Sequence, residues 1–363
     1  MSKSSKKINV LFVLPDFLSG GAQKQCALLY SELVKDNDLE MHFLHIWDGP
    51  NKKWLNGEKN NVIKLNREKL SDLMIVYDIV QIVKSKKIQV VVSWLHPADT
   101  YCWLVKILLR NILWVMTERD SSYPDGWKYK LRKYFARHAD VLLANSKKGC
   151  EYWEKNYQNK IDVRLVNNIC APYEIKNKSS HDRINNIVSL GRLEPQKNII
   201  KLISVIKKWI LNGGCNAVIG GSGSMSDYVK YEISSLQGAS YGGYISDPMS
   251  IFEKSKVFIS LSIHEGTPNS LIEAIVAGCV VVASKIDEHV AILGENYPFY
   301  VEINSETDEI VSILDKAIIF SGAGEYELCK VMKNAFDAIN KMDGAYVASQ
   351  YKNVFFEVAE KNA

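Results

Sequence analysis

The chain alternates short apolar runs with longer segments in which apolar residues recur at helical spacing. The runs are rich in β-branched residues and bounded by Gly, Pro, Asn or Asp, as strands of a buried sheet are. A first series lies near 8–14, 39–46, 88–95, 112–120 and 139–146, and a second near 185–193, 216–224, 255–262 and 279–284. Strands that alternate with helical patterns form parallel βαβ units. The pattern therefore predicts an α/β fold with two doubly wound halves.

The segment 167–185, between the two series, is polar, contains a proline and lacks periodicity, which is typical of a linker. We therefore expect a first domain over 1–170, a linker over 171–184 and a second domain over 185–343. Helical spacing returns at 344–361, where we expect a helix that packs back on the first domain. A length of 363 residues suits two domains.

Composition narrows the class of protein. Apolar residues make up 47% and charged residues 24%, as in soluble globular proteins, and a net charge of +4 does not indicate nucleic acid. Seven cysteines without a CxxC pair favour free thiols in a reducing compartment over a zinc site. The basic N-terminus reads as a polar tail before a strand, and the apolar window 101–116 is interrupted by Lys106 and Arg110. We expect a cytoplasmic protein.

Several unusual loops follow predicted strands, and ligands of doubly wound domains bind beyond the carboxyl ends of the strands. In "SLGRLEPQKN", Arg192 and Lys197 precede a helix whose N-terminal amides also attract anions, which suits a diphosphate. Two solvated surface cations are the alternative. In "VIGGSGSM", Gly221 either lets the backbone approach a ligand or turns the chain, and the motif is a weak nicotinamide fingerprint. Gly21, before the first helix, leaves the same two interpretations open.

The stretch "SIHEGTPNSLIEAIVAG" places Glu265 just beyond a strand and Glu273 within the following helix, which we expect to begin near Asn269 and end before Gly278. Amides of the loop and helix start can bind anions, whereas carboxylates accept hydrogen bonds from hydroxyls. A nucleotide sugar offers both kinds of group. A carboxylate that only caps the helix is the alternative.

Taken together, "GRLEPQKN", "GGSGS", "GYISDP" and "HEGTPNSLIEAIVAGCVVVAS" resemble the nucleotide-sugar-binding half of the retaining glycosyltransferases of family 4. These enzymes have the GT-B fold, in which two Rossmann-like domains face a central cleft. The resemblance is specific over 186–284 and includes a pair of glutamates separated by seven residues. In the first half it is looser and rests on "FLSGGAQ" and "ADVLLANS".

The resemblance implies a role for each matching residue. Arg192 and Lys197 would neutralise the donor diphosphate, and Glu273 would hold the ribose hydroxyls. Glu265 would face the donor hexose together with the loop amides. The remaining donor-binding candidates are Gly21, Gly221, Tyr244, Ile245, Gly266, Thr267, Pro268 and Asn269, of which Tyr244 and Ile245 would border the base.

The resemblance also implies transfer with retention of configuration through an oxocarbenium-like state, in which the leaving nucleoside diphosphate helps to deprotonate the acceptor. No metal or other cofactor is expected, since two cations and a helix terminus can serve the diphosphate, and the only DxD, Asp36 to Asp38, reads as a turn. Many relatives carry a histidine where this chain has "VMTERD". The acceptor-side catalytic group is therefore one of Glu118, Arg119 and His96, unless each is a satisfied loop residue.

The expected acceptor is a glycan or lipid-linked glycan, as in surface polysaccharide biosynthesis. The segment 126–140 is basic and amphipathic, and it would either dock peripherally on the anionic inner face of the cytoplasmic membrane or present a solvated basic face. Three other classes of protein stay open. A glycoside hydrolase would use Glu265 and Glu273 as its paired carboxylates, but the cationic loops would then have no role. A nucleotide-sugar epimerase of the same fold would need no acceptor, and a non-catalytic nucleotide-binding protein would bind a donor without turnover.

Overall fold

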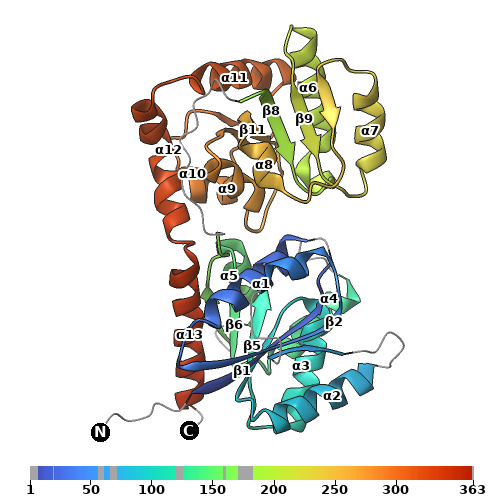
Figure 1. The fold of residues 1–363 in the computed structure, drawn as a ribbon, viewed down its shortest axis with the longest axis vertical. Coiled ribbons are helices and arrows are strands. Elements are labelled where there is room, and N and C mark those ends of the chain that lie inside the picture. The colour runs from blue at the N-terminus through green and yellow to red at the C-terminus, as the bar shows by residue number, and fades with distance from the viewer. Residues whose placement is uncertain are drawn as a thin grey trace. The chain divides into compact units, whose positions relative to one another are not determined.

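The computed structural model describes residues 7–18, 20–55, 61–65, 72–119, 126–157, 161–170 and 183–361. The chain forms two compact units, which we describe separately (Figure 1). The first comprises Met1–Ala171 and Lys341–Ala363, and the second comprises Pro172–Asn340. The predicted linker at 171–184 falls largely outside the described residues. Residues 183 and 184 of this linker are described. Arg183 is anchored in the second unit, where its guanidinium donates hydrogen bonds to the carbonyls of Ser255 and Ala277.

The first unit contains a parallel sheet of seven strands in the order β3-β2-β1-β4-β5-β6-β7. The strands are β1 (Ile8–Asp16), β2 (Leu39–Trp47), β3 (Val62–Lys64), β4 (Val90–Ser93), β5 (Leu113–Glu118), β6 (Val141–Ala144) and β7 (Asp162–Leu165). The helices are α1 (Gly21–Leu33), η1 (Pro50–Trp54), α2 (Asp72–Ser85), α3 (His96–Leu108), α4 (Trp127–Ala136), α5 (Lys147–Tyr157) and α13 (Gly344–Lys361). The order matches a Rossmann sheet, with its switch point between β1 and β4.

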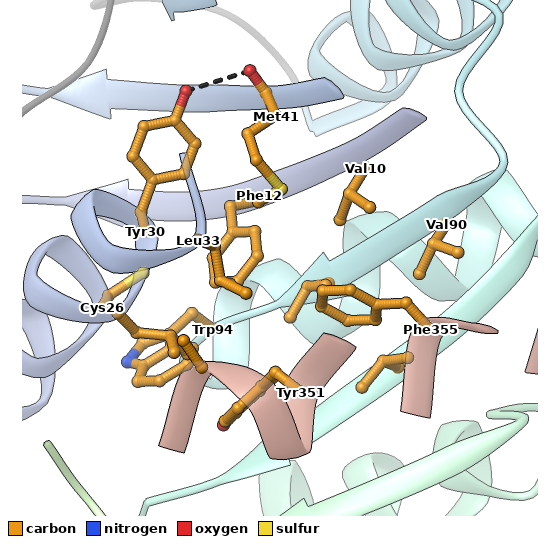
Figure 2. Close-up of a cluster of buried hydrophobic side chains, with 14 of the residues drawn as sticks. Val10, Phe12, Cys26, Tyr30, Leu33, Met41, Val90, Trp94, Tyr351 and Phe355 are labelled. Carbon is orange, nitrogen blue, oxygen red and sulfur yellow. Dashed lines mark hydrogen bonds between the residues drawn. The ribbon is translucent and has the colours of Figure 1, made fainter. Parts of the chain in front are cut away.

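Helices cover both faces of this sheet. On one face α1 and α13 pack against each other, and Tyr351 and Phe355 of α13 lie with Phe12 and Trp94 in the core, as Figure 2 shows. Helices α2, α3, α4 and α5 contribute to the core on the other face. The segment 344–361 is therefore an integral part of the first unit, although the whole second unit precedes it in the sequence.

The second unit contains a parallel sheet of six strands in the order β10-β9-β8-β11-β12-β13. Its strands are β8 (Asn185–Leu190), β9 (Ala217–Gly220), β10 (Ala239–Tyr241), β11 (Ser255–Ser260), β12 (Val280–Ser284) and β13 (Tyr300–Val301). The helices are η4 (Pro195–Lys197), α6 (Ile199–Leu211), α7 (Ser226–Ser234), α8 (Pro248–Phe252), α9 (Asn269–Val276), α10 (Asp287–Leu293), α11 (Thr307–Phe320) and α12 (Glu325–Asn340). Because β8 and β11 are neighbours, their carboxyl ends form the switch point of this sheet. The predicted α/β class, with two doubly wound sheets, is confirmed.

The predicted turn at 36–38 is also confirmed, since it joins α1 to β2. The ammonium of Lys352, on α13, lies 2.8 Å from Asp36 and 2.7 Å from Asp38, so the two carboxylates of the DxD hold the C-terminal helix. Among the residues described, no group of three or more His, Cys, Asp or Glu side chains could hold a metal ion. None of the helices in the described ranges has the length and apolar character needed to span a bilayer.

Candidate functional site

The second unit has a pocket at the switch point of its sheet. The pocket is open to solvent, and the empty space within it, including that open part, is about 410 Å³. It is lined by the ends of β8 and β11 and by the loops that follow them. The polar residues of the lining are Ser189, Arg192, Lys197, Ser260, Ser262, Glu265 and Ser270. The structure therefore brings Arg192, Lys197, Glu265 and Pro268, all predicted from the sequence, to one place.

The two cations reach the pocket from the segment after β8. Gly191 stays tied to the sheet by a hydrogen bond from its amide to the carbonyl of Gly220, 3.1 Å away, and Arg192 then projects as an exposed side chain. The turn η4 carries Lys197, and the left-handed residue Asn198, with φ of 53°, leads into α6. Arg192 is thus held at a strand end with its guanidinium accessible to a ligand.

Glu265 is almost fully buried, with 7% of its surface exposed. Its Oε1 accepts hydrogen bonds from the Lys197 ammonium and, at 2.7 Å, from the Ser262 hydroxyl. Burial alone would raise the pKa of this carboxyl, but the charge of Lys197 and the two hydrogen bonds outweigh it and hold the pKa below its usual value. Glu265 is therefore an ionised carboxylate, fixed at the wall of the pocket by groups from both loops.

The helix α9 begins at Asn269 and ends at Val276, and Gly278 follows with φ of 81°, so both predicted boundaries are confirmed. Pro268 and the first turn of α9 line the pocket. Glu273 is half-buried on the next turn and is not among the lining residues. The pocket lining thus includes one of the two predicted glutamates.

Two glycines of "VIGGSGSM", Gly221 and Gly223, are required by the protein's own backbone. Gly221 has φ of 139°, and a Cβ there would lie 1.7 Å from the carbonyl oxygen of Gly191. Gly223, with φ of 159°, is crowded in the same way by the carbonyl of Leu193. The close approach at Gly221 is thus one of this loop to the loop after β8, and an approach of Gly221 to a ligand stays a prediction.

The remaining candidates of the second unit lie around this pocket to different extents. Gly220 lines the pocket, and the side chain of Ile245 packs over it. The two are so close that a Cβ added to Gly220 would lie 2.8 Å from the Ile245 side chain. Tyr244 is 52% exposed and does not line the pocket, and neither do Gly266, Thr267 and Asn269. Ile245 is the residue of "GYISDP" that lies next to the site.

The acceptor-side candidates lie at the carboxyl edge of the first sheet. His96 is half-buried at the start of α3. Gly21, which was predicted to bind the donor, is the exposed first residue of α1. Arg119 stacks on the ring of Trp94, with its guanidinium carbon 4.1 Å from the ring centroid, and donates hydrogen bonds to Asn168 and to the Tyr351 hydroxyl. Arg119 thus links β5 to α13.

Glu118 differs from the expectation of a loop residue. It is the last residue of β5, and its side chain is fully buried. Its Oε2 accepts hydrogen bonds from Arg132 at 2.7 Å, Trp153 at 2.6 Å and Tyr129 at 3.1 Å. These contacts point the carboxylate into the core of the first unit.

Arg132 contributes to the basic composition of 126–140, but it does not lie on an exposed face of that segment. It is 3% exposed and bridges two buried carboxylates, since its Nε lies 2.7 Å from Asp99 and its Nη1 2.7 Å from Glu118. Among the α4 side chains that the structure describes, the exposed ones are Trp127, Lys130, Leu131 and Tyr134, and the exposed Arg137 and His138 follow the helix. The helix therefore presents a mixed apolar and basic surface and is anchored by a buried ion network.

Ser262 is the part of the site that sequence reasoning did not single out. It is completely buried and donates directly to Glu265. Its position two residues beyond β11, three before the glutamate, is the signal that was available in the sequence. A small hydroxyl residue between a strand end and a buried carboxylate is suited to hold that carboxylate.

Several known proteins are similar in sequence to this chain. Residues 173–335 match the family model of glycosyl transferases group 1. A Campylobacter jejuni α-1,4-N-acetyl-D-galactosaminyltransferase, named for an acceptor on undecaprenyl diphosphate, is 25% identical over 279 residues, which cover 74% of this chain and 77% of that protein. An uncharacterised glycosyltransferase of Methanocaldococcus jannaschii is 25% identical over 327 residues, which cover 78% of this chain and 75% of that protein.

Solved structures extend the likeness to both units. The structure of HepE from Anabaena, solved with UDP and glucose, covers 96% of this chain and 100% of its own with a TM-score of 0.77 and 17% identity. The structure of a glycosyltransferase from Rickettsia africae matches 97% of this chain and 98% of its own length, with a TM-score of 0.76 and 17% identity. The two doubly wound sheets, the family match and the related enzymes together identify the chain as a glycosyltransferase with the GT-B fold.

Proposed function

We propose that this glycosyltransferase moves a hexose-type sugar from a nucleoside-diphosphate sugar to a glycan or lipid-linked glycan, with retention of configuration and without a resident metal, as family 4 enzymes do. The observation that carries the proposal is the convergence of Arg192, Lys197 and an ionised Glu265 on one pocket at the switch point of the second sheet. Two cations suit a diphosphate, and a carboxylate suits the hydroxyls of the sugar beside it.

In the proposed reaction Arg192 and Lys197 stabilise the charge that grows on the departing nucleoside diphosphate. Lys197 pairs with Glu265, so a donor diphosphate would take over part of that interaction. Loss of one well-placed donor at such a charge lowers turnover on the order of 10²-fold to 10³-fold. Arg192→Ala, which removes an exposed side chain, is expected to have an effect of this size without unfolding the second unit.

A thermal-shift screen against UDP, GDP, ADP and their sugars tests the donor class. A ligand present at 100 times its dissociation constant adds about 2.7 kcal/mol to the stability of the protein. NMR of the product then reports the anomeric configuration, and activity that survives EDTA supports the absence of a metal requirement. Stabilisation by none of these nucleotides, or an inverted product, would contradict the proposal. An isomerised donor without any acceptor would favour the epimerase, and binding without turnover a non-catalytic protein.

The acceptor is proposed to be presented at an anionic lipid surface, as in surface polysaccharide biosynthesis. Support comes from the exposed side of α4, where Trp127, Leu131 and Tyr134 are 68%, 41% and 50% exposed and lie beside the exposed cations Lys130 and Arg137. Aromatic and apolar side chains enter the interface while cations meet lipid headgroups. The relative from Campylobacter jejuni is named for a polyprenol-linked acceptor, which agrees with this setting.

Liposome sedimentation tests the surface. Vesicles that contain phosphatidylglycerol should retain the protein at low salt and release it at high salt, whereas phosphatidylcholine vesicles should not retain it. Lys130→Glu should weaken retention, and Lys84→Glu is the matched control, because it makes the same charge change at an exposed position of α2. Equal retention of both variants would show that α4 is not the docking surface.

A further inference from the structure

The second unit contains a buried histidine that the proposed reaction does not use. His289, on α10, is fully buried, and its Nδ1 lies 2.8 Å from the carbonyl oxygen of Ser284. A carbonyl can only accept, so Nδ1 carries a proton, and in the neutral ring the lone pair is on Nε2. Within the described part of the chain, Nε2 is buried without a hydrogen-bond partner. The imidazole is thus fixed in orientation from one side only.

A continuous series of hydrogen bonds leads from this imidazole to the pocket. Ser284, which receives the bond from His289, donates its hydroxyl to the carbonyl of Ser262 at 2.5 Å. Ser262 in turn donates its own hydroxyl to Oε1 of Glu265 at 2.7 Å. The residues belong to α10, the end of β12 and the loop after β11, and none of the four is more than 7% exposed. The path is therefore shielded from water, which would otherwise replace its bonds.

The charges of the pocket act on the same ring. Burial is the main reason why the pKa of His289 falls to about 4, while the Ser284 carbonyl and the charge of Glu265 raise it and Lys197 lowers it. Glu265 and Lys197 are thus the charged groups that face the imidazole, and at neutral pH the ring is uncharged. A neutral ring leaves the ion pair of Lys197 with Glu265 undisturbed.

The carboxylate at the end of the path has one oxygen left for a ligand. Both hydrogen bonds to Glu265 reach Oε1, and no described residue donates to Oε2. Oε2 is therefore the acceptor that a sugar hydroxyl could use, and its direction depends on how Ser262 is held. An error of 1 Å in the placement of such a group can cost on the order of 10²-fold in rate.

We propose that His289 is a positioning residue, whose neutral imidazole fixes Ser284 and Ser262 and thereby aims Oε2 of Glu265 at a hydroxyl of the donor sugar. This inference rests on the proposed function, since it assumes a nucleotide-sugar donor. It predicts that His289 matters for the sugar and not for the nucleoside diphosphate, because the diphosphate contacts Arg192 and Lys197 instead.

The test compares two affinities in the full-length protein. Calorimetry first gives the dissociation constant of the nucleoside diphosphate that binds, UDP, GDP or ADP. It then gives the dissociation constant of a nucleotide sugar with the same base, which is UDP-glucose, UDP-N-acetylglucosamine, GDP-mannose or ADP-glucose. In His289→Phe, the ratio of the nucleotide-sugar dissociation constant to the diphosphate dissociation constant should rise roughly tenfold above its wild-type value. The rate at which donor hydrolysis releases diphosphate should fall roughly tenfold or more. His289→Asn keeps a donor at the position of Nδ1 and should restore both to within about threefold.

Each outcome decides the matter. A folded His289→Phe with the wild-type ratio of affinities and the wild-type hydrolysis rate overturns the positioning role, and so does an equal loss of diphosphate and sugar binding. If His289→Phe does not fold, Ser262→Ala removes only the hydroxyl that bonds Glu265 and must give the same tenfold change, or the role is overturned. A wild-type protein that binds none of the nucleotides would instead overturn the proposed function itself.

Discussion

The buried ion network beneath α4 leads to a sharp prediction for Arg132→Met. The guanidinium bonds Asp99 and Glu118 at 2.7 Å each, and it also donates to the carbonyl of Thr117 at 3.0 Å. Both carboxylates have side chains that are 0% exposed. Methionine fills much of the same volume but offers neither charge nor donor, so the substitution isolates the electrostatic part of the contact.

The magnitude follows from the burial of the partners. Removal of one member of a buried ion network leaves uncompensated buried charge and costs about 3–5 kcal/mol, whereas an exposed ion pair contributes about 0–1 kcal/mol. For a unit of this size, each kcal/mol corresponds to roughly 2–4 °C in melting temperature. We therefore expect Arg132→Met to lower the melting transition of the first unit by about 6–20 °C.

Differential scanning calorimetry or circular dichroism at pH 7 measures the effect, and Lys130→Met is the control because Lys130 is exposed on the same helix. Lys130→Met should shift the transition by less than about 2 °C. If Arg132→Met melts within that same range, the ion network does not hold α4, and the structural account of Glu118 is wrong.

Three further predictions concern stability elsewhere in the molecule. Gly221→Ala should destabilise the second unit by at least about 2 kcal/mol in urea denaturation, because its Cβ would collide with the loop after β8, whereas Gly243→Ala, with positive φ but open space, should cost less. The pKa of His289 is about 4 in the folded protein and 6.5 for an ordinary histidine. As the pH falls, the unfolded chain therefore binds this proton at a higher pH than the folded protein does, and the folded state loses stability. Between pH 7 and pH 4 the wild type should lose about 3 kcal/mol more than His289→Asn, and equal losses would contradict the buried neutral ring. Lys352→Met, which frees the two partly exposed carboxylates of 36–38, should cost only about 1 kcal/mol or less at low salt, and a larger loss would mean that the pair is more buried than described.

The sequence was sufficient for the two sheets and for the loops of the pocket. The alternation of apolar runs and helical spacing predicts the doubly wound units because buried parallel strands leave a continuous apolar signature. Arg192, Lys197 and Glu265 could be located because each follows a strand, and in such sheets strand ends and ligand sites coincide. These predictions depend on local pattern and on a general rule of topology.

What the sequence did not predict depends on contacts between distant segments. Arg132 lies three residues after the buried Tyr129, a spacing that places both on one face of α4, but its partners Asp99 and Glu118 belong to other elements. His289 had no signal at all, because its partner is a main-chain carbonyl. The need for glycine at 221 likewise arises from the backbone of another loop.

The position of α13 in the core of the first unit has a consequence for biosynthesis. Phe12, Trp94, Tyr351 and Phe355 are buried in the same cluster, yet the ribosome translates Pro172–Asn340 between the first pair and the second. At roughly 5–20 residues per second, this interval lasts about 10–30 s. During it, one side of the nascent N-terminal sheet lacks its final cover and exposes aromatic surface that a chaperone could bind. The first unit is thus the first to be synthesised in part and the last to have all of its residues available for folding.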